Sequence, residues 1–469
     1  MKEISLENEL TKYMEGIEVE QLSKRDFRLI GFMLFSLFFG AGNLIFPPFL
    51  GQSAGENAWV SMAGFFITAV GFPVMGVVAV AKSGGLYPLA SRVHSKFAAV
   101  FTVLIYLSIG PCLGIPRAGS LPFEMAVAPY ISGGDGVLVG ARLIYTLVFF
   151  LVAFWLCLTP SKLVDRIGKY LTPALLSLIG LVFIASLFKP LGAYGKATGE
   201  YVSSPFVKGF LEGYLTMDTI AALNFGIVIS LAIQTKGVKS EKAVVNHSIK
   251  AGLMAGALLV AVYAMLCHLG AMSGGRYGMT ENGAQTLNHV MTYLFGAPGA
   301  ILLAVIFTVA CLTTCVGLIT SCSEYFASLT DKISYKAWVS ILSASSMFLA
   351  NMGLNKILAI SVPVLNAIYP IAIVLIALAM LEKFVKQSQA VYGCAILVTG
   401  VISVVDALSQ AGLEITFLVK LFSKLPLYSQ GLGWIVPAII GAGVGYVWQL
   451  LVKDKSLVAK DSKVAMKKI

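Results

Sequence analysis

Long uninterrupted apolar stretches constrain this sequence more than any other feature. The chain contains about twelve of them, each near the length of roughly 20 residues that a membrane-spanning helix needs. Only 12% of the 469 residues are charged, whereas soluble domains carry about 25%. The pattern predicts an all-α polytopic membrane protein, because no soluble core needs so much continuous apolar sequence. The expected spans are 28–50, 57–81, 97–116, 137–158, 168–188, 206–235, 249–271, 298–327, 335–352, 357–381, 390–408 and 432–452.

The distribution of Lys and Arg predicts the orientation of these spans. Of 34 such residues, 25 lie in segments on the same side as the N-terminus when the spans alternate. Basic residues accumulate on the cytoplasmic side. We therefore expect a multi-pass protein of the cytoplasmic membrane with a cytoplasmic segment 1–27 and a cytoplasmic basic tail 453–469. The net charge of +11 follows from this bias and does not call for a nucleic-acid partner. The expected surroundings are a lipid bilayer, and the sequence indicates no obligatory protein partner.

The first apolar stretch is interrupted at FFGAGNLIFPP, residues 38–48. Gly40 and Gly42 permit non-helical backbone, and Pro47 and Pro48 lack the N–H group that a continuing helix uses. At membrane depth, free backbone groups survive only where protein or an aqueous cavity satisfies them. The alternative for this segment alone is a Gly-rich packing face followed by a Pro kink.

A second interruption lies in the sixth stretch, at GYLTMDTIAALNFG, residues 213–226. It contains Asp218, and a charge within a span indicates function because it is costly there. Interrupted first and sixth helices are typical of transporters built from inverted repeats, whose half-helix ends meet at a midplane site. We therefore expect a 5+5 inverted repeat, with halves 28–188 and 206–381. Two extra helices follow in 390–452.

The chemistry of two such breaks suits an amino acid. The N-terminal end of a half-helix offers N–H groups and a positive dipole to a carboxylate. Freed carbonyl groups and an acidic side chain suit an ammonium group or a cation, and apolar walls select the side chain. The substrate site is expected at Gly40, Ala41, Gly42, Asn43, Tyr214, Thr216, Asp218 and Thr219.

Three roles are open for Asp218. It can cap the second half of the sixth helix, pair with the substrate ammonium, or titrate in an H⁺-coupled cycle. Asp is a favoured N-cap residue, and threonines lie close on both sides of it. We expect the cap, with the carboxylate facing the substrate cavity.

Four segments, in this order, resemble a known family. They are FGAGNLIFPP, IGPCLGIPRAGSLPFE (109–124), EGYLTMDTIAALNFGIV (212–228) and ACLTTCVGLITSCSEYF (310–326). The chain resembles, over essentially its whole length, the branched-chain amino acid:cation symporter family (the BrnQ or LIVCS carriers) of the amino acid–polyamine–organocation superfamily. The resemblance implies a leucine-transporter-type fold. It also implies uptake of Leu, Ile and Val by alternating access, coupled to Na⁺ or, as the alternative, to H⁺.

The same resemblance implies one sodium site. In that fold, two carbonyl groups before the first break and an Ala-x-x-[Thr/Ser]-[Thr/Ser] pattern on the eighth helix hold Na⁺. Five neutral oxygens suit a hard monovalent cation. The matching ligands are the main-chain oxygens of Ser36, Phe39 and Ala310 and the hydroxyls of Thr313 and Thr314. Hydroxyls that bond back to their own helix are the structural alternative.

Arg117 and Glu124 lie seven residues apart on the third span, so a helix places them on one face. We expect either an internal charge pair or a gating role. Many leucine-transporter relatives have an arginine after the first break that forms part of an outer salt-bridge gate. This chain has Phe46 at that position, so the resemblance does not imply that gate here.

Three competing functions remain. The nearest is an H⁺-coupled carrier of another neutral amino acid in the same superfamily. A membrane-embedded enzyme would need clustered His, Asp, Glu or metal ligands within the spans, whereas this chain shows isolated carboxylates. A channel would show a repeated pore loop. We expect a transporter rather than an enzyme, and the sequence does not rank Leu, Ile and Val.

Overall fold

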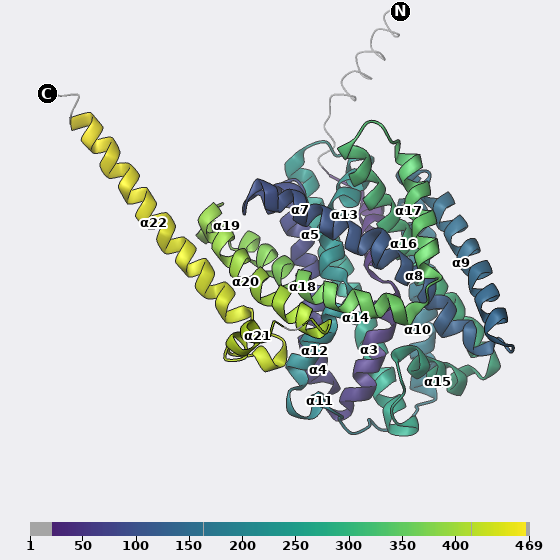
Figure 1. Cartoon of the computed structure of the whole chain (residues 1–469). Helices are drawn as coiled ribbons and strands as arrows, with labels where there is room; N and C mark the ends of the chain where they lie inside the picture. Colours follow the sequence, from purple (N-terminus) through teal and green to yellow (C-terminus); the bar gives the residue numbers. More distant parts are fainter. Residues whose placement is uncertain (1–20, 163, 414, 466–469) are drawn as a thin grey trace, which may run out of the picture.

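A computed structural model describes residues 21–162, 164–413 and 415–465. Within these ranges every regular element is helical. The helices pack into one bundle, and α22 (Ile435–Ala465) extends away from it (Figure 1). The all-helical class predicted from the apolar stretches is therefore confirmed.

Each expected span coincides with a helix or with helices joined at a break. Among the described residues, eight helical runs are long and apolar enough to cross a membrane, or nine if the bent pair Pro205–Thr216 and Asp218–Gln234 is one span. Three helices in the expected spans are shorter, namely α2 (Lys24–Phe38), which is the first part of the first span, α17 (Tyr335–Ala350) and the apolar part of α22, Ile435–Leu451. The unbroken longer ones are α9 (Asp135–Cys157), α14 (Glu241–Tyr277), α16 (Ala297–Leu329), α18 (Leu354–Met380) and α20 (Gln389–Gln410). α10 (Thr172–Phe188) reaches this length together with the turn that precedes it, as the run Asp165–Phe188.

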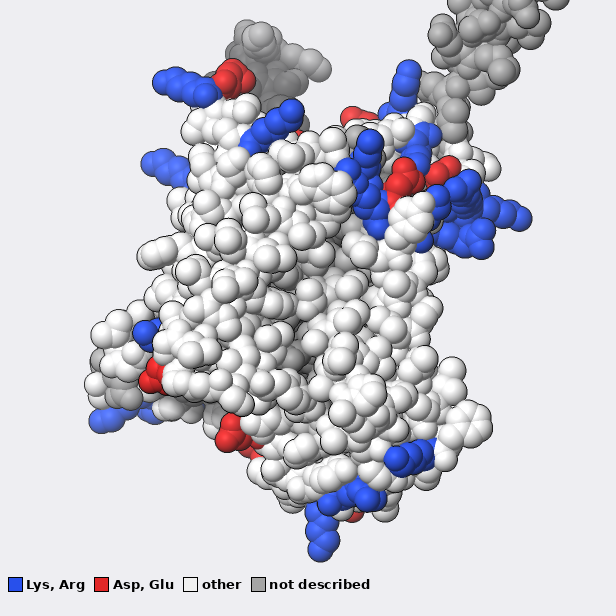
Figure 2. All heavy atoms as spheres, turned by 90° about the vertical axis from the view of Figure 1, so that its right-hand side faces the viewer, with Lys and Arg blue, Asp and Glu red and all other residues white. Residues whose placement is uncertain are grey.

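The outer surface of the bundle is apolar where lipid would contact it. On the face shown in Figure 2, charged side chains gather toward the two ends of the molecule, and a broad band between them carries almost none. Side chains that would be buried in a soluble protein are exposed, among them Val100, Ile144, Trp155, Phe188, Leu397 and Ile439. A bilayer core is the solvent that accepts such a surface.

The first span is divided at its Gly-rich segment. α2 ends at Phe38, and α3 (Ala41–Ala54) begins after Gly40. The Asn43 side chain accepts a hydrogen bond from the Gly40 N–H at 3.1 Å and so closes the first turn of α3. Pro47 and Pro48 lie inside α3. The helix thus resumes before the prolines, and the break itself is only Phe39 and Gly40.

The sixth span is divided in a similar way. α12 (Pro205–Glu212) continues into one 3₁₀ turn, η7 (Gly213–Thr216), and α13 (Asp218–Gln234) follows at a bend of 40°. Between them Met217 takes a left-handed conformation, with φ of 72°. Both interruptions predicted from the sequence are therefore present.

The third span contains a further interruption. α7 (Ser95–Leu107) passes through a π-turn, η3 (Ser108–Cys112), before α8 (Gly114–Ala126) begins. Gly110 has non-helical dihedrals, φ −82° and ψ −124°, and Pro111 follows it. The expected span 97–116 is therefore helical but interrupted, because this Gly-Pro pair stops the helix as the Gly-rich segment does in the first span.

The remaining elements complete or connect the spans. The second span consists of α4 (Ala58–Phe66), the π-turn η2 (Ile67–Gly71) and α5 (Phe72–Ser83). The others are η1 (Gly55–Asn57), α6 (Leu86–Ser91), η4 (Ala128–Tyr130), η5 (Pro160–Lys162), η6 (Val164–Leu171), α11 (Glu200–Ser203), α15 (Gly283–Phe295), α19 (Glu382–Val385), α21 (Thr416–Phe422) and η8 (Tyr428–Gln430).

Candidate substrate and cation site

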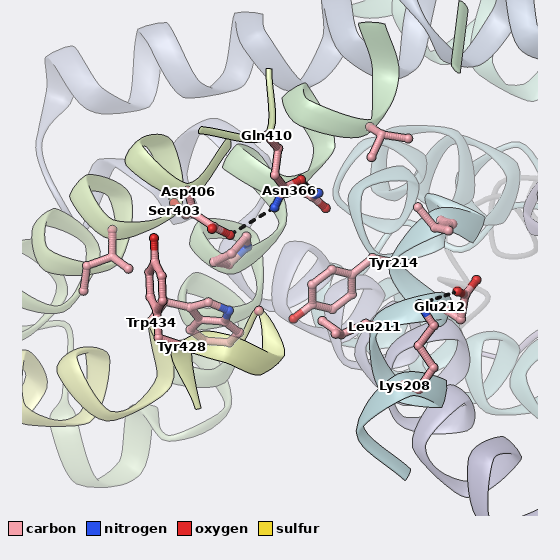
Figure 3. Close-up of a pocket in the computed structure, with 16 residues that line it drawn as sticks. Lys208, Leu211, Glu212, Tyr214, Asn366, Ser403, Asp406, Gln410, Tyr428 and Trp434 are labelled. Carbon is pink, nitrogen blue, oxygen red and sulfur yellow. Dashed lines mark hydrogen bonds and ion pairs between the residues drawn. The ribbon is translucent and has the colours of Figure 1, made fainter. Parts of the chain in front are cut away.

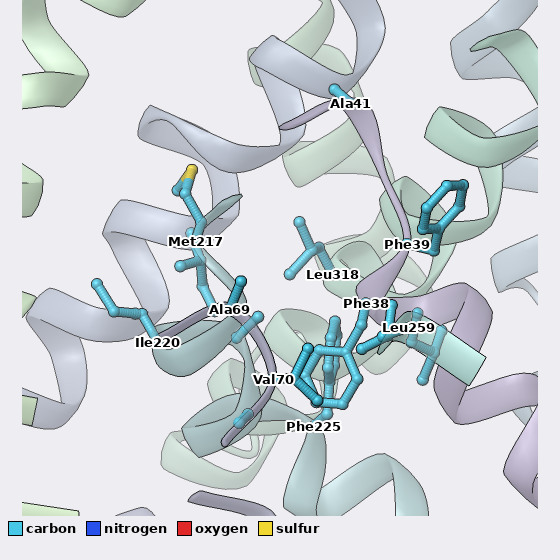
Figure 4. Packing of buried hydrophobic residues seen from close by; sticks show 14 of the residues in the cluster. Phe38, Phe39, Ala41, Ala69, Val70, Met217, Ile220, Phe225, Leu259 and Leu318 are labelled. Carbon is cyan, nitrogen blue, oxygen red and sulfur yellow. The ribbon is translucent and has the colours of Figure 1, made fainter. Parts of the chain in front are cut away.

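The breaks of the first and sixth spans meet at a small cavity of about 40 Å³. Parts of α8 and α16 complete its wall. Figure 4 shows the first break as a thin stretch of ribbon between Phe39 and Ala41, with Met217 of the second break and Leu318 nearby. The apolar lining consists of Leu37, Phe38, Ile109, Ala118, Met217, Ala221 and Leu318.

The two glycines of the first break allow this close approach. A Cβ atom on Gly40 would lie 2.7 Å from Oγ1 of Thr314. One on Gly42 would lie 2.7 Å from Nη2 of Arg117 and 3.1 Å from the main-chain oxygen of Leu215. A side chain at Gly40 would therefore displace Thr314, and one at Gly42 would displace Arg117.

Six of the eight expected substrate residues line the cavity: Gly40, Ala41, Gly42, Asn43, Thr216 and Asp218. The other two side chains lie elsewhere. Thr219 donates its hydroxyl to the main-chain oxygen of Thr68 at 2.9 Å. The ring of Tyr214 stacks on Tyr369 with centroids 4.7 Å apart. The 3₁₀ turn and the left-handed residue after it orient these side chains away from Asp218.

Tyr214 belongs to a second cavity, of about 220 Å³, between α12 and the C-terminal helices. In Figure 3 its ring points toward Trp434 and Tyr428, on the far side of that cavity. The expectation that Tyr214 and Thr219 contribute side chains to the central cavity is corrected accordingly.

Asp218 connects the two breaks and does not cap its helix. Met217 occupies the N-cap position, and no side-chain cap bond forms there. The buried Asp218 carboxylate instead accepts from Nδ2 of Asn43 at 2.6 Å and from the Tyr263 hydroxyl at 3.0 Å. The hydroxyl of Thr216 accepts from the Asp218 N–H at 3.4 Å. The predicted capping role was wrong, because the carboxylate turns toward the first break and α14.

Tyr263 is a site residue that sequence reasoning missed. It lies on α14, is fully buried, and contacts both Asn43 and Asp218. The only signal in the sequence was a hydroxyl-bearing aromatic residue within an apolar span. Its partner could not be known, because α14 approaches the breaks only in the folded bundle.

Four of the five expected sodium ligands are linked to one another by hydrogen bonds. The hydroxyls of Thr313 and Thr314 approach the main-chain oxygen of Ser36 at 3.1 and 3.2 Å. Thr313 also lies 2.9 Å from the oxygen of Ala310, the back-bonding that the structural alternative expected. The fifth expected ligand is the main-chain oxygen of Phe39. It lies in the peptide bond that joins Phe39 to Gly40, and Gly40 packs against Thr314.

Thr172 of α10 adds a hydroxyl beside this oxygen cluster. It lies 2.8 Å from the hydroxyl of Ser36 and 3.0 Å from the main-chain oxygen of Phe32. The end of α2 is thereby tied to α10 on one side and α16 on the other. Nothing in the sequence singled out Thr172, since it stands alone at the start of an apolar span.

Arg117 and Glu124 do not form the internal charge pair that was one of their two expected roles. Glu124 lies 2.8 Å from Nη2 of Arg142 on α9. The Arg117 guanidinium donates from Nη1 to the oxygen of Leu215 at 3.0 Å and lies 5.3 Å from the ring centroid of Phe46. Residues seven apart share a helix face but are separated by about 10 Å along the axis, which explains the correction.

Comparisons with known proteins agree with this architecture. Residues 23–452 match a family model described as branched-chain amino acid transport protein. The chain is 45% identical to the branched-chain amino acid permease BraB of Bacillus subtilis, across 92% of this chain and 97% of that protein. It is 44% identical to the branched-chain amino acid transport system 2 carrier protein of Pseudomonas aeruginosa, across 92% and 98%.

Among solved structures, the fold resembles Mhp1, a nucleobase-cation-symport-1 family transporter, in a closed conformation. The TM-score is 0.57 at 14% identity, over 92% of this chain and 93% of that one. At this identity the likeness supports the fold alone, and it confirms the expected fold class.

Proposed function

Because this chain belongs to the branched-chain amino acid transport protein family, we propose that it imports Leu, Ile and Val by symport with Na⁺. Its relatives are named permeases and carriers, so the chain is a transporter and not an enzyme. The observation that carries the proposal is the cavity between the two breaks. There the first turn of α3 and the carboxylate of Asp218 border the same space.

The two ends of an amino acid match this space. The N–H groups of Ala41 and Gly42, in the first turn of α3, have no acceptor within their own helix and suit a carboxylate. Asp218 suits the ammonium group. The apolar lining suits a branched aliphatic side chain, and such a pocket separates Leu, Ile and Val by only about 1–3 kcal/mol per methylene.

The cavity in this conformation is small, about 40 Å³. Alternating access requires the half-helices to move relative to their neighbours, and the breaks are the points at which they can bend. The breaks therefore support alternating access.

Sodium binding is proposed at the main-chain oxygens of Ser36, Phe39 and Ala310 with the hydroxyls of Thr313 and Thr314. An ion there would replace hydrogen bonds that the two threonines now make to Ser36. It would also fix the end of α2, from which the substrate-binding break begins. Substrate and Na⁺ would therefore strengthen each other's binding, and the effect must be reciprocal.

Uptake of labelled leucine into proteoliposomes tests this function. We expect an inward Na⁺ gradient to drive accumulation, and isoleucine and valine, but not lysine or glutamate, to compete. Counterflow of preloaded leucine is expected of a carrier, and its absence would indicate a channel. Strong inhibition by lysine would contradict the proposed substrate class.

One observation favours the H⁺-coupled alternative, a carrier of another neutral amino acid. Asp218 is a buried carboxylate held by a tyrosine hydroxyl and an amide, and such a group can carry a proton through a transport cycle. Uptake that follows a pH gradient without Na⁺ would support this alternative and overturn the sodium proposal.

A further inference from the structure

We propose that Arg117 binds the carboxylate of the transported amino acid as a fixed cation in the substrate cavity. This inference rests on the proposed amino acid transport and adds a residue that the two helix breaks do not contain. Its basis is a guanidinium group that lines the cavity with hydrogen-bond donors left over.

The first observation is the unsatisfied chemistry of Arg117. The residue is 3% exposed, and only Nη1 has an acceptor, the oxygen of Leu215. Nε and Nη2 have no hydrogen-bond partner among the described residues, and no ion pair of Arg117 occurs there. A buried charge without a counter-ion is strongly unfavourable. The arrangement is therefore incomplete without an anion.

The second observation is where these donors lie. Nη2 of Arg117 packs against Gly42, in the first turn of α3, where the helix itself offers N–H groups. A guanidinium edge and a helix N-terminus thus border the cavity together. A planar guanidinium can hold a carboxylate through two parallel hydrogen bonds, which a single N–H group cannot.

The third observation is the opposite charge across the cavity. Asp218 also lines it, and no ion pair between Asp218 and Arg117 is present in the described residues. Hydrogen bonds from Asn43 and Tyr263 hold the carboxylate in place. A zwitterion fits between the two groups, with its carboxylate at Arg117 and its ammonium at Asp218.

A purely structural role would use only part of this side chain. The bond to Leu215 and the contact with the Phe46 ring hold α8 against both breaks, but they involve Nη1 and the guanidinium face. Neither contact uses Nε or Nη2. The experiment must therefore separate loss of carboxylate recognition from general damage to the site.

The test compares two ligands that differ only at the carboxylate. Leucine and leucinamide are measured as competitors of labelled leucine binding to the purified full chain, at a pH where both amino groups are protonated. Arg117→Gln is expected to weaken leucine by roughly 10- to 100-fold, the range for hydrogen bonds to a charged group, and to leave leucinamide nearly unchanged. Arg117→Lys, which keeps the charge, should retain part of the preference for leucine.

Arg142→Gln is the matched control, because Arg142 pairs with Glu124 and does not line the cavity. It should keep the wild-type ratio of the two affinities. Equal weakening of leucine and leucinamide in Arg117→Gln, or an unchanged ratio, would overturn the role of Arg117. If Arg117→Gln does not fold, loss of the preference for leucine in a folded Arg117→Lys supports the proposal, and a wild-type ratio there contradicts it. Absence of leucine transport in the wild-type protein would instead refute the proposed function.

Discussion

At the scale of single residues, the site is a set of polar groups that satisfy one another inside an apolar bundle. Asn43 joins the two breaks by capping its own half-helix and donating to Asp218. Thr313 and Thr314 join α16 to the end of α2, because both hydroxyls donate to the main-chain oxygen of Ser36. Unsatisfied polar groups are costly at membrane depth, so each such contact fixes a geometry. Nε and Nη2 of Arg117, a residue that lines the cavity, have no such partner among the described residues, and a ligand can satisfy them.

The threonine pair provides the first prediction at this scale. The double change Thr313→Val with Thr314→Val keeps the volume but removes two of the five proposed Na⁺ ligands. We expect the Na⁺ concentration for half-maximal leucine uptake to rise at least about tenfold, the result of losing roughly 1.4 kcal/mol of binding. Thr308→Val is the control, because Thr308 bonds within α16 and to Tyr145, away from Ser36. Unchanged Na⁺ dependence in the double variant would locate the cation elsewhere.

Asp218 provides the second prediction at this scale. Asp218→Asn keeps the shape and removes the charge, so a charge-assisted bond to the substrate ammonium is lost. We expect leucine affinity to fall by roughly tenfold or more while the protein remains folded. Thr219→Val is the control, since the Thr219 hydroxyl faces Thr68. Near-normal affinity with a shifted pH optimum would favour H⁺ coupling, and near-normal affinity alone would show that no ammonium contacts this carboxylate.

At the scale of elements, the half-helix α3 is held by backbone contact with its neighbours. A Cβ atom on Gly270 of α14 would lie 1.9 Å from the oxygen of Pro48, and one on Gly283 of α15 only 1.8 Å from the oxygen of Ile45. Gln52, near the end of α3, accepts from the hydroxyls of Thr280 and Thr286 at 2.6 and 3.0 Å. In this conformation α3 therefore cannot move without separating from α14 and α15.

This packing predicts the effect of one methyl group. Gly270→Ala should force α14 away from α3 and lower the stability by about 1–3 kcal/mol, the usual cost of overpacking. Thermal unfolding of the detergent-solubilised protein measures this effect as a lower melting temperature. Gly180→Ala on α10 is the matched control, because nothing lies within 4 Å of the added Cβ atom there. An unaffected melting temperature in Gly270→Ala would mean that the two helices are not in contact in solution.

At the scale of the whole molecule, the charged ends and the apolar band define how the bundle sits in a bilayer. The excess of Lys and Arg in the segments on the N-terminal side supports our proposal that this side faces the cytoplasm. The division into two five-helix halves, 28–188 and 206–381, stays a prediction.

The proposed orientation can be tested with epitope tags. A tag after residue 469 should be protected from protease in right-side-out vesicles. A tag inserted at Gly133, in the loop between η4 and α9, should be cleaved, because that loop is expected on the outer face. The opposite pattern would reverse the orientation. Leucine uptake by both tagged proteins serves as the control for folding.

The sequence by itself determined the features that depend on local chemistry. Apolar length and scarce charge specified the spans, and the glycines at 40 and 42 specified the first break. The Gly110-Pro111 pair carried an equally readable signal for the third break, which the span prediction missed. Such features follow from backbone sterics and from the cost of burying charge, so a short stretch of residues suffices to predict them.

Only the tertiary structure decided which side chains meet. Asp218 turns from the expected cap to Asn43 and Tyr263, while Tyr214 turns to a different cavity. Arg117 faces the breaks, while Glu124 pairs with Arg142 of α9. These outcomes depend on how each helix is rotated against neighbours that lie far away in the sequence. A rotation of one residue, about 100° in an α-helix, is enough to move a side chain out of the site.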